Sequence, residues 1–181
     1  MTTSPLTGTW DIDPGHSRIG FATRHAMVTR VRGAFNEVSG EVVLDAEHPE
    51  HDTASIVVRM DSIDTRNAQR DDHLRSADFF DVTTHPEMTF RSTRIEEVDE
   101  NGYIVTGDLT IRDQTRNINI PLRFVGTDTD PFGNVRAGFE GSRRIDRRDW
   151  GIAWNTPLDS GGLLVSDRIQ LEFELSLIKR V

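Results

Sequence analysis

The chain has 181 residues, of which 35% are hydrophobic and 28% charged, and its formal net charge at pH 7 is −9. This balance predicts one globular domain, because a disordered chain carries less apolar material and apolar runs such as 56–58 are far too short for a membrane-spanning helix of about 20 residues. The acidic charge argues against a nucleic-acid partner, and the lack of cysteine excludes disulfides, zinc–thiolate sites and thiol catalysis.

Residues 1–15 contain neither a basic region nor an apolar run, so the pattern of a secretory signal peptide is missing. We therefore expect a cytoplasmic protein. No linker, internal repeat or low-complexity tract interrupts the rest of the sequence. This organisation predicts an N-terminal tail over residues 1–9 and a single domain over residues 10–181.

The first alternating stretch places Ile19, Phe21, Thr23 and His25 on one face of a predicted strand. If that face lines an apolar lumen, Thr23 and His25 add polar groups to it. His25 then has two interpretations. It is either a structural histidine near the rim, with its hydrogen bonds satisfied, or a partner for the head group of a ligand.

Two short segments resemble metal sites without completing one. His48 and His51 are three residues apart, but Pro49 disrupts the helical turn that would bring them together, and the sequence fixes no third ligand nearby. We expect a solvated loop there. The segment 128–133 begins like a calcium-binding loop, but Phe139 stands where such a loop needs its bidentate glutamate. We therefore expect no metal ion and no organic cofactor.

One segment interrupts the strand pattern with a helical one. Residues 66–76 contain no glycine or proline and almost no β-branched residue, which predicts a short helix capped by Thr65. Phe79 and Phe80 follow directly. We expect these two rings to lie beside the helix, near one end of the fold.

A second irregular stretch, residues 150–166, also lacks alternation. We interpret it as a long excursion with Trp150, Trp154 and Leu158 packed inward. The basic run 143–148 that precedes it is diluted by acidic residues, which is typical of a solvated turn with ion pairs.

Alternation of apolar and polar residues recurs along the chain, in segments 55–61, 105–111, 117–124, 135–140 and 169–177. A period of two with one wet face predicts antiparallel strands, and Asn101-Gly102 predicts a tight type I′ hairpin turn. Long strands joined by hairpins must close or stack. We therefore expect an all-β fold, an up-and-down antiparallel barrel of about eight strands with one or two short helices. A two-sheet sandwich is the alternative.

Gly107 belongs to the same alternating face as Val105, Leu109 and Ile111, so we expect it to face the lumen. It has two interpretations: a gap over which a ligand chain passes, or a kink that lets the strand curve. If the first holds, a tryptophan at position 107 would displace a ligand. A tryptophan at Thr106 would point outward and leave binding intact.

Ordered motifs along the chain resemble those of the YceI family. The matching residues are 10–17, Phe21, His25, Gly33, Phe35, Thr65, 70–76, 78–81, 85–86, Phe90, 107–111, 145–151, 154–155 and 161–162. The resemblance runs from about Trp10 to Leu177. It implies an extended lipocalin-like barrel that holds a long apolar chain, such as a polyisoprenoid or a related lipid or amide, without a metal or redox cofactor.

Two features depart from the family pattern. The turn after segment 107–111 reads Arg-Asp-Gln-Thr at 112–115, where the family has a Gly-Val-Thr type of sequence. Many family members carry a signal peptide, so the family's periplasmic role in envelope lipid handling is not carried over to this sequence. Family members often pair, and the resemblance leaves a homodimer open.

We expect a non-catalytic protein that carries, stores or sequesters a polyisoprenoid, an isoprenoid quinone or a related lipid or fatty amide inside the barrel. Burial of such a chain contributes about 25 cal/mol per Å² of apolar surface. The expected lumen residues are Phe21, Thr23, His25, Val42, Leu44, Ile56, Val58, Met60, Met88, Phe90, Leu109, Ile111, Leu122, Phe124 and Phe139. The helix and the excursion add His73, Leu74, Phe79, Phe80, Trp150 and Trp154.

The residues leave two other functions open. A lipid-modifying enzyme of the isomerase or cyclase type would use His25, His73 or Asp72 as acid and base, and turnover of the lipid would reveal it. A plugged barrel that serves as an interaction module would release no ligand on extraction.

Overall fold

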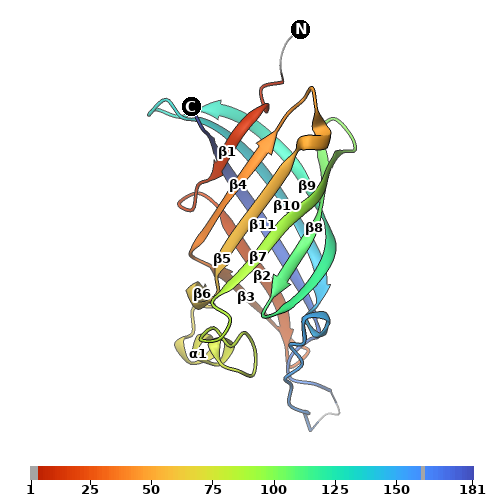
Figure 1. The fold of residues 1–181 in the computed structure, drawn as a ribbon. Coiled ribbons are helices and arrows are strands. Elements are labelled where there is room, and N and C mark those ends of the chain that lie inside the picture. Colours follow the sequence, from red (N-terminus) through yellow and green to blue (C-terminus); the bar gives the residue numbers. More distant parts are fainter. Residues whose placement is uncertain (1–3, 160–161) are drawn as a thin grey trace.

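The structure is a computed structural model that describes residues 4–159 and 162–181. Within these residues one sheet has the strand order β1-β4-β5-β7-β8-β9-β10-β11-β2-β3-β6, and a further pairing of β1 with β11 closes it into a barrel (Figure 1). The strands are β1 (Gly8–Ile12), β2 (Arg18–His25), β3 (Thr29–Phe35), β4 (Val38–Leu44), β5 (Thr53–Arg59), β6 (Ile63–Asp64), β7 (Glu87–Glu97), β8 (Gly102–Ile111), β9 (Gln114–Thr129), β10 (Val135–Asp146) and β11 (Arg168–Lys179). The expected all-β antiparallel barrel is confirmed.

The closed ring consists of eight strands, and the other three extend it. β1 and β2 pair one after the other with β11, through Trp10↔Lys179 and Phe21↔Leu171. In the same way β4 and β3 pair with β1 and β2, and β5 and β6 pair with β4 and β3. Strands β1 and β2 therefore follow one another as one long strand with a short interruption, and so do β3 and β4. The same holds for β5 and β6, which the 3-10 turn η2 (Met60–Ser62) separates. The expected number of about eight strands therefore describes the ring.

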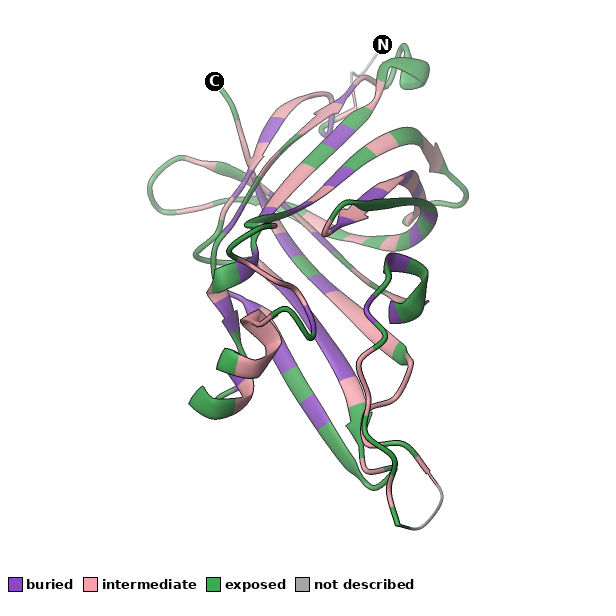
Figure 2. Ribbon diagram, turned by 60° about the horizontal axis from the view of Figure 1, so that its bottom comes forward, coloured by how far each residue is buried: buried purple, intermediate pink, exposed green. Residues whose placement is uncertain are grey.

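The first described residues and the C-terminus lie at one end of the barrel, which we name the upper end, and α1 (Ala68–Arg75) lies at the other, the lower end (Figure 1). The turn η3 (Arg147–Trp150) follows β10 and leads into the segment 151–167, which we name the 151–167 loop. This loop and α1 flank the lower end on two sides (Figure 2). Figure 2 also shows buried and exposed residues alternating along the strands, as the sequence pattern predicts.

The helix α1 is shorter than expected, and Asn67 caps it in place of Thr65. The Asn67 side chain accepts a hydrogen bond from the backbone N–H of Arg70. Thr65 is buried, and both its backbone N–H and its hydroxyl donate to the Asp71 carboxylate. The expected cap was wrong because Thr and Asn are both favourable caps, and the sequence does not show which of them is buried.

The β7–β8 hairpin also differs from the expectation. Asn101-Gly102 forms no type I′ turn, because Gly102 already belongs to β8 and its carbonyl accepts a hydrogen bond from the backbone N–H of Val98. The tight two-residue turn lies instead between β8 and β9, where Arg112 adopts a φ of 58°.

The inward faces of the strands form one hydrophobic core. Its most deeply buried large side chains are Trp10, Met60, Ile63, Trp150 and Leu177. Leu6, from the expected tail, is also buried, and its carbonyl accepts a hydrogen bond from Trp10 Nε1 at 2.8 Å. The barrel therefore includes residues that precede Trp10. Among the described residues, no helix has the length and apolar character needed to cross a membrane.

Candidate functional site

The lumen of the barrel contains two adjacent apolar cavities. The upper cavity has a volume of about 70 Å³ and the middle cavity about 40 Å³. Ile56, Phe90, Ile120 and Phe173 line both of them, so the two cavities are separated only by lumen side chains. A water molecule occupies about 30 Å³ in the liquid, so the lumen is largely filled by its own side chains.

A third pocket of about 120 Å³ lies at the lower end, where β2, β3, α1 and the 151–167 loop meet. Phe21, Leu74, Phe79 and Trp154 contribute to its apolar wall. The residues that bring polar groups to this pocket are Thr23, Arg24, His25, Arg70 and His73. Apolar surface dominates the walls of all three cavities, and the lower pocket differs from the other two in having arginine and histidine side chains among its lining residues.

His73 connects α1 to the 151–167 loop across this pocket. Its ring meets the Trp154 ring edge-to-face, with 4.6 Å between ring centroids, and meets the Phe79 ring in the same way at 5.1 Å. Its Nε2 lies 2.8 Å from Asp78 Oδ2. Aromatic pairs of this geometry stabilise by about 0.5–1.5 kcal/mol each, so these contacts hold α1 and the 151–167 loop together beside the lower pocket.

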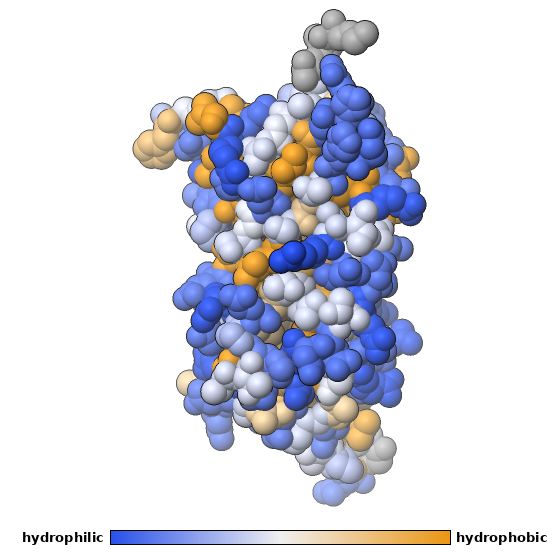
Figure 3. All heavy atoms as spheres, viewed as in Figure 1, coloured by the Kyte–Doolittle hydropathy of each residue, from blue (hydrophilic) through white to orange (hydrophobic). Residues whose placement is uncertain are grey.

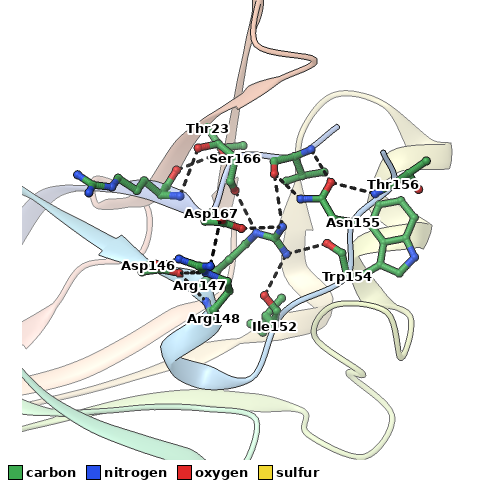
Figure 4. Close-up of polar contacts among 12 residues, drawn as sticks. Thr23, Asp146, Arg147, Arg148, Ile152, Trp154, Asn155, Thr156, Ser166 and Asp167 are labelled. Atoms are coloured by element: carbon green, nitrogen blue, oxygen red, sulfur yellow. Dashed lines mark hydrogen bonds and ion pairs between the residues drawn. The ribbon is translucent and has the colours of Figure 1, made fainter. Parts of the chain in front are cut away.

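Arg147 fastens the 151–167 loop to the barrel (Figure 4). Its side chain is 5% exposed, and its guanidinium donates to the carbonyls of Ile152, Trp154 and Ser166 at 2.9–3.0 Å. Burial lowers the pKa of Arg147 from its ordinary value, although the Asp167 carboxylate 3.6 Å away acts in the opposite direction. The interpretation of this run as a solvated turn was therefore wrong for Arg147, because the loop folds over it.

The upper cavity opens beside a groove of about 780 Å³, and Leu44, Ile95 and Tyr103 line both. The carboxylates of this groove belong to Asp45, Glu50, Asp52, Glu96 and Glu97. Burial raises the pKa of the Asp52 carboxyl, and burial also raises the pKa of Tyr103. The upper mouth of the barrel is therefore an apolar opening with an acidic rim.

Most of the expected lumen and lid residues line one of the three cavities. The upper and middle cavities include Val42, Leu44, Ile56, Val58, Met88, Phe90, Leu109, Leu122 and Phe139. The lower pocket includes Phe21, Thr23, His25, His73, Leu74, Phe79 and Trp154. Five expected residues line none of the three and instead pack within or against the core: Met60, Phe80, Ile111, Phe124 and Trp150. Trp150 is held there because its Nε1 donates to the Leu109 carbonyl at 2.9 Å.

Several residues of the upper cavity were missed, among them Ile95, Tyr103, Ile120, Phe173 and Leu175. Ile120, Phe173 and Leu175 occupy inward positions of the alternating segments 117–124 and 169–177, so the period-two pattern was sufficient to find them. Tyr103 carries a hydroxyl at the border between lumen and acidic groove, and nothing in its local sequence marks that position.

Gly107 faces inward, but the Phe90 ring fills the space above it. A Cβ at this position would lie 2.5 Å from Phe90 Cζ and 2.5 Å from the carbonyl oxygen of Arg91. The pairing of β7 with β8 shifts register between Ser92 and Arg94, directly beside it. The glycine therefore permits a close approach of two strands, and the interpretation as a gap for a ligand chain was wrong. A tryptophan there would disrupt the barrel.

The loop with His48 and His51 is exposed, as expected, but it does form a turn. Pro49 begins the 3-10 turn η1 (Pro49–His51) rather than preventing it. Glu50 thereby joins the two histidines, and the potential ligand atoms of the three residues lie within 4.8 Å of one another. The sequence alone does not identify Glu50 as this third group, because the turn that brings it close is not evident from the residue pattern. All three side chains face solvent, so water competes for each of these atoms.

His25 and His73 line the same lower pocket, but the geometry does not join them as an acid–base pair. His73 Nε2 is hydrogen-bonded to Asp78. His25 is exposed at the end of β2, where its backbone pairs with Val165. Asp72 points into solvent with a side chain that is 80% exposed. The pocket therefore offers polar contacts to a ligand, without a relay between the proposed catalytic groups.

Curated relatives align with most of the chain. A UPF0312 protein of Pectobacterium carotovorum is 36% identical over 143 residues, which cover 79% of this chain and 74% of the relative. A UPF0312 protein of Pseudomonas aeruginosa is 36% identical over 142 residues, which cover 78% of this chain and 74% of the relative.

Solved structures share the barrel. BcnA of Burkholderia cenocepacia superposes with a TM-score of 0.79 at 25% identity, over 91% of this chain and 98% of BcnA. A YceI protein of Campylobacter jejuni gives 0.73 at 26% identity, over 87% of this chain and 90% of that chain. A polyisoprenoid-binding domain from Saccharophagus degradans, implicated in plant cell wall breakdown, gives 0.69 at 14% identity, over 94% and 98%. The YceI-like domain matches residues 10–177, and this chain therefore belongs to the YceI family.

Proposed function

We propose that the protein binds one long-chain hydrophobic ligand, a polyisoprenoid, an isoprenoid quinone or a related lipid or fatty amide, and carries, stores or sequesters it unchanged. The observation that carries this proposal is the series of cavities in the barrel, all with mainly apolar walls, of which the lower one also has arginine and histidine side chains among its lining residues. The fold neighbour from Saccharophagus degradans, described as a polyisoprenoid-binding domain, supports this class of ligand.

The polarity of the cavities orients the proposed ligand. Its apolar chain occupies the upper and middle cavities, where Ile56, Phe90 and Phe173 lie on the shared wall. Its head group lies in the lower pocket, where His25 is among the lining residues, whereas Arg70 already donates to Thr65 through its Nε and one Nη. This orientation buries the chain and leaves the polar end beside hydrogen-bonding partners, as ligand sites generally require.

The present cavities are small for this ligand. Each is well below the about 300–1,000 Å³ of typical ligand pockets, so binding requires lumen side chains to move. Phe90 and Phe173 separate the upper from the middle cavity, and the flexible Met88 lines the middle one. Rotation of these side chains joins the cavities without a change in strand register.

Mass spectrometry of an organic extract of the purified protein tests the proposal. We expect one dominant long-chain species close to one molecule per chain. An extract that contains only mixed membrane lipids at low stoichiometry would contradict it. Incubation of the loaded protein followed by a second extraction separates carrier from enzyme, because a carrier returns its ligand unchanged and a modified product would support the isomerase or cyclase alternative.

A further inference from the structure

The lower half of the barrel carries a concentration of arginines on its outer surface. Arg24 and Arg30 are paired across β2 and β3, and Arg32 follows on β3. Arg144 on β10 pairs with Gln170 on β11, and Gln170 pairs with Ala22 on β2. Paired residues of neighbouring strands, and residues two apart on one strand, point to the same face. Arg144 and Arg168 therefore share the outward face with Arg24. Four of these arginines line a shallow groove of about 620 Å³, namely Arg24, Arg30, Arg144 and Arg168.

These five arginines, which we name the arginine face, are exposed, and none forms an ion pair with a residue of the described ranges 4–159 and 162–181. Glu172, the one carboxylate of the groove, lies 3.9 Å from Arg18. Elsewhere in the described part of the chain some arginines, such as Arg136 and Arg180, are paired with carboxylates, and the unpaired ones are not gathered in one groove as these are. The chain has a net charge of −9, so the arginine face is a local exception on an acidic molecule.

Exposed apolar side chains lie next to the arginine face. Met27 and Val28, in the turn between β2 and β3, are 66% and 78% exposed, and Leu163 in the 151–167 loop is 46% exposed. The two segments are joined, since the Ala26 backbone N–H donates to the Leu164 carbonyl at 2.7 Å. Hydrophobic surface is visible at the lower tip in Figure 3. The 151–167 loop contains two carboxylates near this surface. Asp167 is paired with Arg147 and Arg148, 3.6 Å away from each, so Asp159 is the carboxylate whose charge opposes that of the arginine face.

We propose that the lower end docks on the surface of an anionic lipid bilayer. The arginine face then attracts the lipid head groups, and Met27, Val28 and Leu163 enter the interface. The lower pocket opens beside these residues, since Thr23 and Arg24 line both it and the arginine-lined groove. The inference rests on the proposed function for one point only, that a ligand passes between the bilayer and this pocket.

The described residues of the opposite end lack this combination of charge and apolar surface. Phe132, in the turn between β9 and β10, is 89% exposed, but its neighbours in the chain are Asp128 and Asp130. The Asp130 carboxylate is paired with Arg136, so the exposed carboxylate of this turn is that of Asp128, which an anionic surface repels. Charge complementarity therefore selects the lower end for docking.

Vesicle flotation tests the proposal with the full chain. We expect binding to vesicles of phosphatidylcholine with added phosphatidylglycerol, no binding to phosphatidylcholine alone, and loss of binding at high salt. Arg144→Gln with Arg168→Gln should weaken binding about 25-fold, because each arginine near an anionic surface contributes about fivefold. The matched control is Arg94→Gln with Arg123→Gln, which removes the same charge from exposed positions of β7 and β9 and should change binding less than twofold.

A second pair of variants tests the apolar contacts. Met27→Ser with Val28→Ser should weaken vesicle binding, whereas Phe132→Ser should leave it unchanged. Absence of binding to anionic vesicles by the folded wild type, equal losses in test and control variants, or an Arg144- and Arg168-dependent preference for duplex DNA over vesicles would overturn the proposal. Extraction of the bound ligand from each variant separates the two proposals. The variant Arg144→Gln with Arg168→Gln should retain its ligand but no longer bind vesicles.

Discussion

Arginines secure both ends of the barrel, but they do so in opposite surroundings. At the lower end Arg147 is buried and donates to four backbone carbonyls. At the upper end Arg136 is half-buried and donates to the carboxylates of Asp13 and Asp130 at 2.7 and 2.8 Å. Backbone carbonyls do not titrate between about pH 2 and pH 7, and salt screens the buried contacts of Arg147 only weakly. The carboxylates that bind Arg136, in contrast, are protonated at low pH. The two ends should therefore respond differently to salt and pH.

The two mouths of the barrel differ in charge as well. The upper mouth is rimmed by carboxylates such as Asp52 and Glu97, whereas the lower pocket adjoins the arginine face. The apolar lumen between them carries no comparable asymmetry. The two ends of the barrel therefore differ in charge, and the variants below separate the contributions of each end.

The largest effect is expected from Arg147→Met. This change keeps apolar bulk but leaves the carbonyls of Ile152, Trp154 and Ser166 without their donor. A buried acceptor without a partner costs about 1–3 kcal/mol, so we expect the free energy of unfolding to fall by about 3 kcal/mol in total. Thermal unfolding followed by circular dichroism should show a Tm lower by roughly 6–12 °C.

Arg148→Met is the matched control for this prediction. Arg148 is the next residue, its side chain is 57% exposed, and it pairs with Asp146 at 2.7 Å. A surface pair of this kind contributes about 0–1 kcal/mol. Hydrogen exchange in Arg147→Met should accelerate in η3 and the 151–167 loop and stay unchanged in the upper parts of β4 and β5. Equal loss of stability in both variants would refute a special role for Arg147.

The features that the sequence predicted are those that repeat along the chain. The inward positions of segment 169–177 recur at every second residue, so the face that builds the lumen could be assigned without knowledge of the partners of β11. The location of Phe79 beside the helix followed from chain proximity alone. These inferences use local geometry, which the sequence contains directly.

The features that the sequence did not predict depend on contacts between distant segments. Arg147 lies in a basic run, and its burial depends on carbonyls from a loop that has no periodic pattern. The space above Gly107 is filled from β7, which its own strand does not reveal. The choice between Thr65 and Asn67 as the helix cap depended on the burial of Thr65 by the rest of the barrel.

The second prediction probes the lumen between the two ends. Ala54 lines the upper cavity, and Ala54→Leu fills part of its about 70 Å³. When the ligand chain also occupies this cavity, the added leucine overpacks it, and overpacking costs about 1–3 kcal/mol. Because about 1.4 kcal/mol corresponds to a tenfold change in affinity, binding of the extracted long-chain ligand should weaken about tenfold. Ser55→Leu is the control, because the next residue of β5 is exposed on the outer face. Titration of both folded variants with that ligand checks the result, and equal affinities would argue against an upper-cavity location for the chain.

The smallest effect is expected from Arg136→Gln, and it should depend on pH. Hydrogen bonds from Arg136 are the largest cause that lowers the pKa of Asp13 and that of Asp130. A carboxyl group with a lowered folded-state pKa contributes stability above its unfolded pKa of about 3.9 and loses that contribution as pH falls through the folded value. The wild type should therefore have the higher Tm at pH 7, and the difference should shrink as both carboxylates are protonated below about pH 4. The Tm difference between wild type and Arg147→Met should change less over the same range, because its hydrogen-bond acceptors are carbonyls and its titratable partner is the more distant Asp167 carboxylate at 3.6 Å. Parallel Tm measurements on both variants between about pH 7 and pH 2 check the contrast. A pH-independent Arg136→Gln effect would show that the upper end is held by packing and not by its ion pairs.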